Sequence, residues 1–291
     1  MASALTWNEK GVKLAEVESA LARLRSEAAA GSPSMRTSVM THIAWVPAPW
    51  EKQARAALAG MAERHPSRTI LLFPDADAGE SRIDAAVDVE RYELPGADRG
   101  VVTEVVELRL RGSRAKAPAS IVEPLLISDL PVFLRWRGEP AWGAQELEQL
   151  VEIADRLIVD STEWDDLPFP YRKLEELFPR TAVSDIAWER TSRWRSLLAS
   201  LWPEVGEVGT IRVKGTEAQA WLLAGWLRSR LGRADIAMEH EPAEKLVGID
   251  LDGKPAPFPP GDPPTPSDVL SEELDRFTRE PVYEAAVASA K

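Results

Sequence analysis

The 291-residue sequence contains no cysteine, and histidine occurs only three times. The absence of thiols excludes disulfides, iron–sulfur clusters, thiolate zinc sites and cysteine-based catalysis or redox sensing. The three histidines are scattered and no two are four residues apart, so they form no zinc site without help from carboxylates. We therefore expect neither a metal nor a cofactor.

Basic residues are also scarce, since 35 Lys and Arg stand against 47 Asp and Glu and give a formal net charge of −12. A surface this acidic repels nucleic-acid phosphates and anionic headgroups, so we expect neither nucleic acid nor a membrane as a partner. No apolar run approaches the roughly 18 residues of a membrane span, and the N-terminus lacks a basic-then-apolar signal pattern. These features predict a cytoplasmic protein.

Familiar catalytic fingerprints are missing too. The chain has no G-x-G-x-x-G or G-x-x-x-x-G-K-[ST] phosphate loop, no G-x-S-x-G elbow and no H-E-x-x-H motif. Its many carboxylates are expected to be solvated surface groups, so no catalytic residue is assigned. These absences favour a binding or regulatory role over an enzymatic one.

The pattern of apolar residues predicts an α/β fold. Residues 1–32 are predicted to form an N-terminal helix, opened by a capping box of Thr6 and Glu9. Residues 33–165 alternate between strand and helix patterns, which is typical of an α/β domain with a mixed sheet and helices on its faces. Strands are expected at 37–46, 69–73, 85–94, 101–110, 131–136 and 156–160, with helices at 50–64, 119–127 and 144–154.

The second half follows a different pattern, which predicts a smaller α+β C-terminal domain over residues 166–254. Its helices are expected at 171–178, 184–202 and 216–231, and its strands at 207–214, 235–240 and 245–251. The last of these helices has a Thr216/Gln219 capping box and ends at Gly232. Seven prolines in residues 255–266 predict an extended spacer, and 267–291 a helical segment interrupted at Pro281.

Two segments combine tryptophan with arginine, the pair most enriched in binding hot spots. One ends a predicted strand with Arg135, Trp136 and Arg137, and ligands of α/β sheets gather at such carboxyl ends. Alternatively, Trp136 only covers the end of the sheet. The other segment carries Trp188 and Arg195, which lie off the apolar stripe and fit either guanidinium–indole stacking or a partner surface.

A third segment, His65-Pro66-Ser67-Arg68, lies between a predicted helix and strand. Ser67 and Arg68 can bind an anion there, with His65 as a partner whose charge depends on pH. The alternative is a simple helix stop, because histidine favours a helix C-terminus and proline ends the turn.

Taken in order, these segments resemble the OpcA family, known as glucose-6-phosphate dehydrogenase assembly proteins. The matching stretches extend from about residue 35 to the end of the chain: RTSV (36–39), HPSR (65–68), 105–112 with PLL (124–126), 129–138, DRLIVDS (155–161), 185–198 and PVYEAA (281–286). Relatives from oxygenic phototrophs carry cysteines tied to thioredoxin control, which are absent here. Where relatives often have a Trp-Trp pair, this chain has Arg135-Trp136.

The resemblance implies a non-catalytic protein that binds glucose-6-phosphate dehydrogenase, promotes its active oligomer and so acts as an allosteric activator in the oxidative pentose phosphate pathway. We predict that Trp136, Arg137, Trp188 and Arg195 contact this partner.

One alternative is a sensor or enzyme for a sugar phosphate. In it His65, Ser67, Arg68, Arg135 and Arg137 converge on an anion at the carboxyl edge of the sheet. A plainer alternative is a structural module whose tryptophans all lie in the core.

Overall fold

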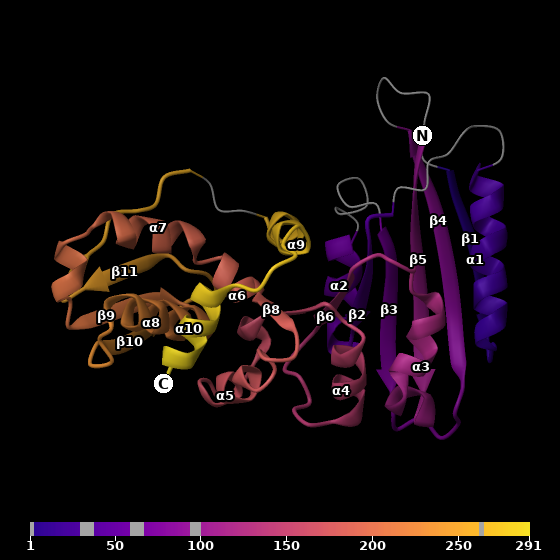
Figure 1. Cartoon of the computed structure of the whole chain (residues 1–291), viewed down its shortest axis with the longest axis horizontal. Helices are drawn as coiled ribbons and strands as arrows, with labels where there is room; N and C mark the ends of the chain where they lie inside the picture. Colours follow the sequence, from indigo (N-terminus) through magenta and orange to yellow (C-terminus); the bar gives the residue numbers. More distant parts are fainter. Residues whose placement is uncertain (1–2, 30–37, 59–66, 94–99, 262–264) are drawn as a thin grey trace. The chain divides into compact units, whose positions relative to one another are not determined.

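The structure, a computed structural model, describes residues 3–29, 38–58, 67–93, 100–261 and 265–291 (Figure 1). It divides into two compact units, Met1–Leu157 and Ile158–Lys291. One sheet has eight strands in the order β1-β4-β5-β3-β2-β6-β7-β8, and the other has four in the order β10-β9-β11-β12. The predicted α/β class, with a mixed sheet and a smaller second sheet toward the C-terminus, is confirmed. The predicted domain limits at 32, 165, 254 and 266 stay predictions.

The first unit is built around parallel strands that are buried on both faces. Its elements are β1 (Ser3–Lys10), α1 (Leu14–Ala29), β2 (Met40–Trp45), α2 (Glu51–Leu58), β3 (Ser67–Asp75), β4 (Ile83–Glu93), β5 (Gly100–Arg111), α3 (Pro118–Val122), β6 (Val132–Trp136) and α4 (Gln145–Glu152), with β7 (Arg156–Val159) at its end. Strands β5, β3, β2 and β6 run parallel, whereas β1 and β4 are antiparallel to their neighbours. Every residue of β2 is buried, including the polar Thr41 and His42 among its apolar residues.

The predicted N-terminal helix is wrong for residues 3–10, which form a strand. These residues pair with β4 along their whole length, a long-range interaction that a local pattern does not contain. Thr6 and Glu9 lie within this strand and cap no helix. The helix itself begins at Leu14, after Gly11 turns the chain at a φ of 68°.

The second unit contains the smaller sheet and several short helices. Its elements are α5 (Phe169–Glu175), β8 (Ala182–Asp185), α6 (Ile186–Glu189), α7 (Ser192–Ser200), β9 (Thr210–Gly215), α8 (Glu217–Leu231), β10 (Ala237–Pro242), β11 (Gly248–Leu251), β12 (Lys254–Pro255), α9 (Pro266–Leu274) and α10 (Pro281–Ser289). The predicted capping box of Thr216 and Gln219 is present, and Gly232 ends α8 in the left-handed conformation at a φ of 64°.

The predicted helix 184–202 and the predicted helical segment 267–291 have other bounds in the structure. Instead of one helix over 184–202, the chain forms the end of β8 and then α6 and α7. The break is stabilised by Thr191, whose hydroxyl donates to the carbonyl of Trp188 at 2.7 Å. Pro281 begins α10 rather than interrupting a helix, because the first turn of a helix needs no N–H from that residue.

Helix α10 packs against α8, and Gly225 permits the close approach of the two helices. A Cβ atom at this position would lie 2.1 Å from the carbonyl oxygen of Ala286 and 3.0 Å from the amide nitrogen of Ala290. Only glycine therefore fits between the two backbones.

Replacing Gly225 with alanine is expected to lower the free energy of unfolding by about 2 kcal/mol, because α10 has to move away from α8. The same change in an uncrowded helix stabilises by about 1 kcal/mol. Urea denaturation measures the difference. Gly248→Ala is the control, since its Cβ would meet only Lys214 Cβ at 3.9 Å. Equal stability of the two variants would contradict this account of the α8–α10 contact.

Candidate functional site

At the carboxyl ends of β2 and β6, two tryptophans stack within the first unit. Trp45 and Trp136 are opposite each other in the parallel ladder, and their ring centroids lie 5.0 Å apart at an interplanar angle of 20°. Trp136 is only 2 % exposed. Trp136 therefore covers the end of the sheet, as in the alternative interpretation of this segment. Its buried ring offers no surface to a partner.

The next residue, Arg137, is half-buried and lies over a third indole. Its guanidinium carbon is 4.8 Å from the ring centroid of Trp50, and its amide nitrogen donates to the carbonyl of Trp45 at 3.0 Å. Gly138 then turns the chain at a φ of 75°, close to the indole nitrogen of Trp50. Of the two partner contacts predicted in this segment, only Arg137 retains accessible surface.

The predicted anion site does not assemble. Parallel pairing places Arg68 level with Thr41 near the start of β2, whereas Arg135 is level with Ala44 near its end. Three residues of strand separate the two levels, which is roughly 10 Å. Convergence of Ser67, Arg68 and Arg135 on one anion is therefore wrong, because these residues lie toward opposite ends of the parallel strands. His65 lies outside the described residues.

Arg68 is instead paired inside the protein. Its Nε donates to Glu104 at 2.7 Å and its Nη1 donates to the carbonyl of Leu125 at 2.7 Å. Glu104 also pairs with Arg25 at 3.1 Å. Arg135 is buried as well and donates to the carbonyl of Trp136. These guanidiniums stabilise the fold rather than facing solvent.

In the second unit Trp188 is completely buried, contrary to its predicted place away from the apolar stripe. The prediction assumed one continuous helix, whereas Trp188 belongs to α6 and Arg195 to α7. The guanidinium carbon of Arg195 lies 3.4 Å from the ring centroid of Trp188, whose indole N–H donates to Glu280 at 2.6 Å. Burial lowers the pKa of Arg195 to about 10. Arg195 itself is half-buried and forms the outer layer of this stack.

Several acidic side chains surround this stack, and Arg276 contacts three of them. It pairs with Glu189 at 2.6 Å, with Glu280 at 3.2 Å and with Glu273 at 3.3 Å. Burial raises the pKa of Glu273 to about 7, although a hydrogen bond with Ser184 and the charge of Arg276 oppose this shift. Glu273 is therefore an acid that titrates near neutrality.

A second buried network was not predicted from the sequence. Asp185 accepts hydrogen bonds from the Ser161 hydroxyl at 2.6 Å and from the Ala187 amide at 2.8 Å, and Tyr171 donates to Ser161 at 3.0 Å. Burial and the charge of Asp160 raise the pKa of Asp185 to about 6. Asp160 caps the following turn by accepting a hydrogen bond from the Thr162 amide at 3.2 Å.

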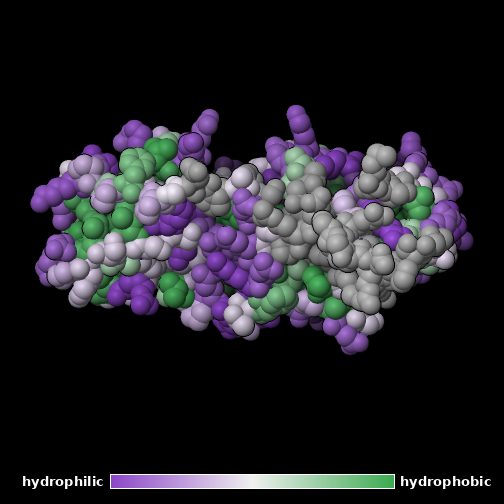
Figure 2. Space-filling view, turned by 90° about the horizontal axis from the view of Figure 1, so that it is seen from above, coloured by the Kyte–Doolittle hydropathy of each residue, from purple (hydrophilic) through white to green (hydrophobic). Residues whose placement is uncertain are grey.

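All eleven tryptophans lie in the described part of the chain, and only one is exposed. Trp202, two residues after the end of α7, is 66 % exposed, and its ring lies against Gly206. The alternative in which all tryptophans lie in the core is therefore wrong for Trp202. Among the described residues on the face in Figure 2, apolar side chains lie in small groups separated by hydrophilic ones.

Within the described ranges, no group of three or more His, Asp or Glu side chains is arranged to hold a metal ion. The helices of those ranges are all too short or too polar to cross a membrane.

Because Arg68 is a structural cation, Arg68→Met should lower the free energy of unfolding by about 3 kcal/mol, since it leaves the buried Glu104 without its nearest partner. The double variant Arg68→Met/Glu104→Gln should recover most of that loss, because no buried charge then lacks its partner. Denaturant titration of the three proteins checks this. A single variant as stable as the natural chain would contradict the structural role.

The raised pKa of Glu273 makes stability depend on pH. The folded state keeps this proton up to about pH 7, whereas the unfolded chain releases it near 4.5, so this group's stabilising contribution is lost as pH rises between these values. Glu273→Gln mimics the protonated acid. The free energy of unfolding of the variant, relative to that of the natural chain, should therefore rise by up to about 3 kcal/mol between pH 4.5 and pH 8.

Chemical denaturation across this pH range measures the difference. Glu204→Gln, at an exposed carboxylate, is the control with which the Glu273→Gln curve is compared. A pH-independent difference for Glu273→Gln would contradict the assignment.

Comparison with known proteins supplies the context for these sites. Residues 56–176 match a family model described as the glucose-6-phosphate dehydrogenase subunit N-terminal domain, and residues 181–257 match one described as the C-terminal domain of that subunit. Curated proteins named OxPP cycle protein OpcA are similar. The one from Nostoc punctiforme is 27 % identical over 62 % of this chain and 41 % of its own length.

The relative from Synechococcus elongatus is 27 % identical over 70 % of this chain and 50 % of its own length. The relative from Synechocystis is 26 % identical over 62 % of this chain and 40 % of its own length. The chain thus aligns with half or less of the length of these relatives. The two family models follow one another along the chain in the order N-terminal domain, then C-terminal domain, and together extend from residue 56 to residue 257. This chain belongs to the OpcA family.

Proposed function

We propose that this chain is a non-catalytic assembly and activator protein that binds glucose-6-phosphate dehydrogenase and promotes its active oligomer in the oxidative pentose phosphate pathway. The observation that carries the proposal is the consecutive match to both domains described as belonging to a glucose-6-phosphate dehydrogenase subunit. The names of the relatives, which refer to the OxPP cycle, support the pathway. The expected cytoplasmic location stays a prediction.

Activation would follow from linkage between binding and oligomer formation. A protein that binds the active oligomer more tightly than its inactive form shifts the population toward the active form, in proportion to the difference in affinity. No chemistry by the chain itself is required. The effect should therefore saturate with the concentration of the chain and disappear on dilution.

The contact surface that we propose differs from the one expected from sequence. Trp136 and Trp188 are buried, so in this proposal the contacts are made by two half-buried guanidiniums, Arg137 over Trp50 and Arg195 over Trp188. We assign the contact expected of those two indoles to Trp202, because its large ring is 66 % exposed. Trp and Arg are the residues most enriched in binding hot spots.

The alternative function, a sensor or enzyme for a sugar phosphate, loses its specific support. The side chains assigned to its anion site are separated along the strands, and Arg68 and Arg135 are buried in internal hydrogen bonds. The assembly role is therefore the better supported of the two.

The proposal is tested by mixing the chain with glucose-6-phosphate dehydrogenase from the same organism. Enzymatic rate and mass by light scattering are followed together. We expect a saturable rise in rate that accompanies a shift toward the larger oligomer. No complex and no change in rate at micromolar concentrations would contradict the proposed function.

Trp202→Ala should weaken the complex about 30-fold, the loss expected for a hot-spot tryptophan worth about 2 kcal/mol. Phe169→Ala is the matched control, because this ring is also 66 % exposed but carries Arg172 over its face. The control should bind like the natural chain. If Trp202→Ala bound equally well while the natural complex formed, the contact surface would be wrong and the function would stand.

A further inference from the structure

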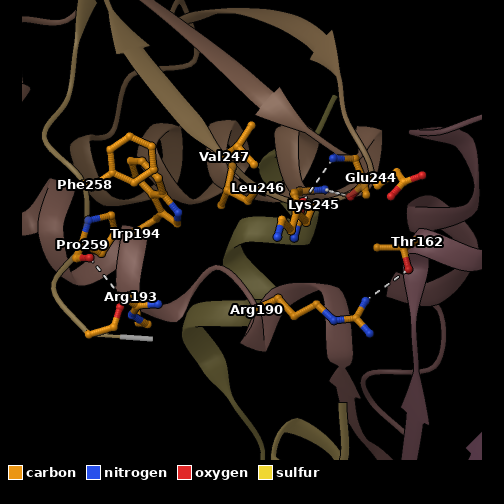
Figure 3. A pocket seen from close by; sticks show the side chains of 13 residues that line it. Thr162, Arg190, Arg193, Trp194, Glu244, Lys245, Leu246, Val247, Phe258 and Pro259 are labelled. Atoms are coloured by element: carbon orange, nitrogen blue, oxygen red, sulfur yellow. Dashed lines mark hydrogen bonds between the residues drawn. The ribbon is translucent and has the colours of Figure 1, made fainter. Parts of the chain in front are cut away.

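A cavity of about 650 Å³ opens in the second unit (Figure 3). Its wall is formed by the end of α6, the beginnings of α7 and α8, the loop before β11 and the proline-rich stretch after β12. The volume is within the range of about 300–1,000 Å³ that is typical of small-molecule sites. None of the four side chains predicted as partner contacts lines it.

Basic side chains gather around this cavity, although the chain as a whole carries a charge of −12. Arg190, Arg193 and Lys245 line it, against a single carboxylate, Glu244. Arg190 is held in place by Asp160 at 3.1 Å. Lys245 is exposed and has no hydrogen-bond or ion-pair partner among the residues that the structure describes. This concentration of positive charge favours an anionic ligand.

Helix α8 adds to the same field. Its N-cap, Thr216, and Gln219 in its first turn both line the cavity. A helix of 15 residues carries a partial positive charge at this end, which stabilises a nearby anion such as a phosphate. The positive end of the helix and the charge of Lys245 therefore both favour an anion in the cavity.

An aromatic wall completes the cavity. Phe258 is 73 % exposed and lies against Trp194, with ring centroids 5.6 Å apart. Arg193 donates to the Pro259 carbonyl at 3.0 Å and so fixes the segment that carries this phenylalanine. In Figure 3 the two rings lie at one end of the cavity, while Lys245, Glu244 and Thr162 lie at the other. The cavity thus has an aromatic end and a charged end.

We propose that this cavity binds a nucleotide. The base lies against Phe258 and Trp194, and the phosphate lies between Lys245, Arg190 and the start of α8. Glu244 accepts a hydrogen bond from a sugar hydroxyl. A sugar phosphate without a base would use only the charged end and would leave the Phe258 ring exposed. Longer nucleic acids are disfavoured by the net charge of −12 that the whole chain carries.

Calorimetric titration of the full chain with AMP, adenosine and inorganic phosphate tests the proposal. AMP should bind at least about tenfold more tightly than adenosine or phosphate, because only AMP uses both ends of the cavity. Lys245→Gln should weaken AMP about tenfold and leave adenosine unchanged. Phe258→Ala should weaken AMP and adenosine by the same factor. Lys173→Gln, at an exposed lysine outside the cavity, is the control.

Several outcomes would overturn the proposal. These are the absence of saturable AMP binding at millimolar concentrations, or AMP binding that neither variant weakens. Phosphate that binds as tightly as AMP, with no effect of Phe258→Ala, would show an anion site without a place for a base. The titration contains no dehydrogenase, so its result is independent of the proposed assembly function.

Discussion

Internal neutralisation of carboxylates by guanidinium groups is the interaction on which both units depend. An acidic chain that buries carboxylates has to pair them, because an isolated buried charge is strongly destabilising. Arg68 pairs with Glu104 in the first unit, and Arg276 pairs with Glu189 in the second. Arginines that the sequence pattern assigned to a ligand, such as Arg68, therefore stabilise the fold instead.

Burial of the aromatic rings determines which side chains stay accessible for binding a partner. Stacking places Trp136 and Trp188 in the interior, and the charged groups near them that keep accessible surface are Arg137 and Arg195, the contacts of our proposal. Trp202 is the indole that the packing leaves exposed. A protein that acts by binding another protein needs such accessible anchors, and their position in the fold cannot be deduced from enrichment in tryptophan alone.

The cavity of the second unit gives the chain a second means of recognition. Its charged and aromatic ends come from segments far apart in sequence, the α6–α7 region and residues 244–261. A ligand there would connect the loop before β11 with the proline-rich stretch after β12. If the partner surface included these segments, ligand and partner would be linked, since each would favour the same arrangement of the loop.

The sequence by itself determined the α/β class, most strands and helices, and the cap of α8 by Thr216, because these features depend on local periodicity and on single turns. It did not determine that residues 3–10 form a strand, since their partner, β4, lies more than 70 residues away. Tertiary structure alone decided the burial of Trp188, the separation of Arg68 from Arg135 and the assembly of the cavity. Each depends on strand register or on packing between distant segments, which no local pattern contains.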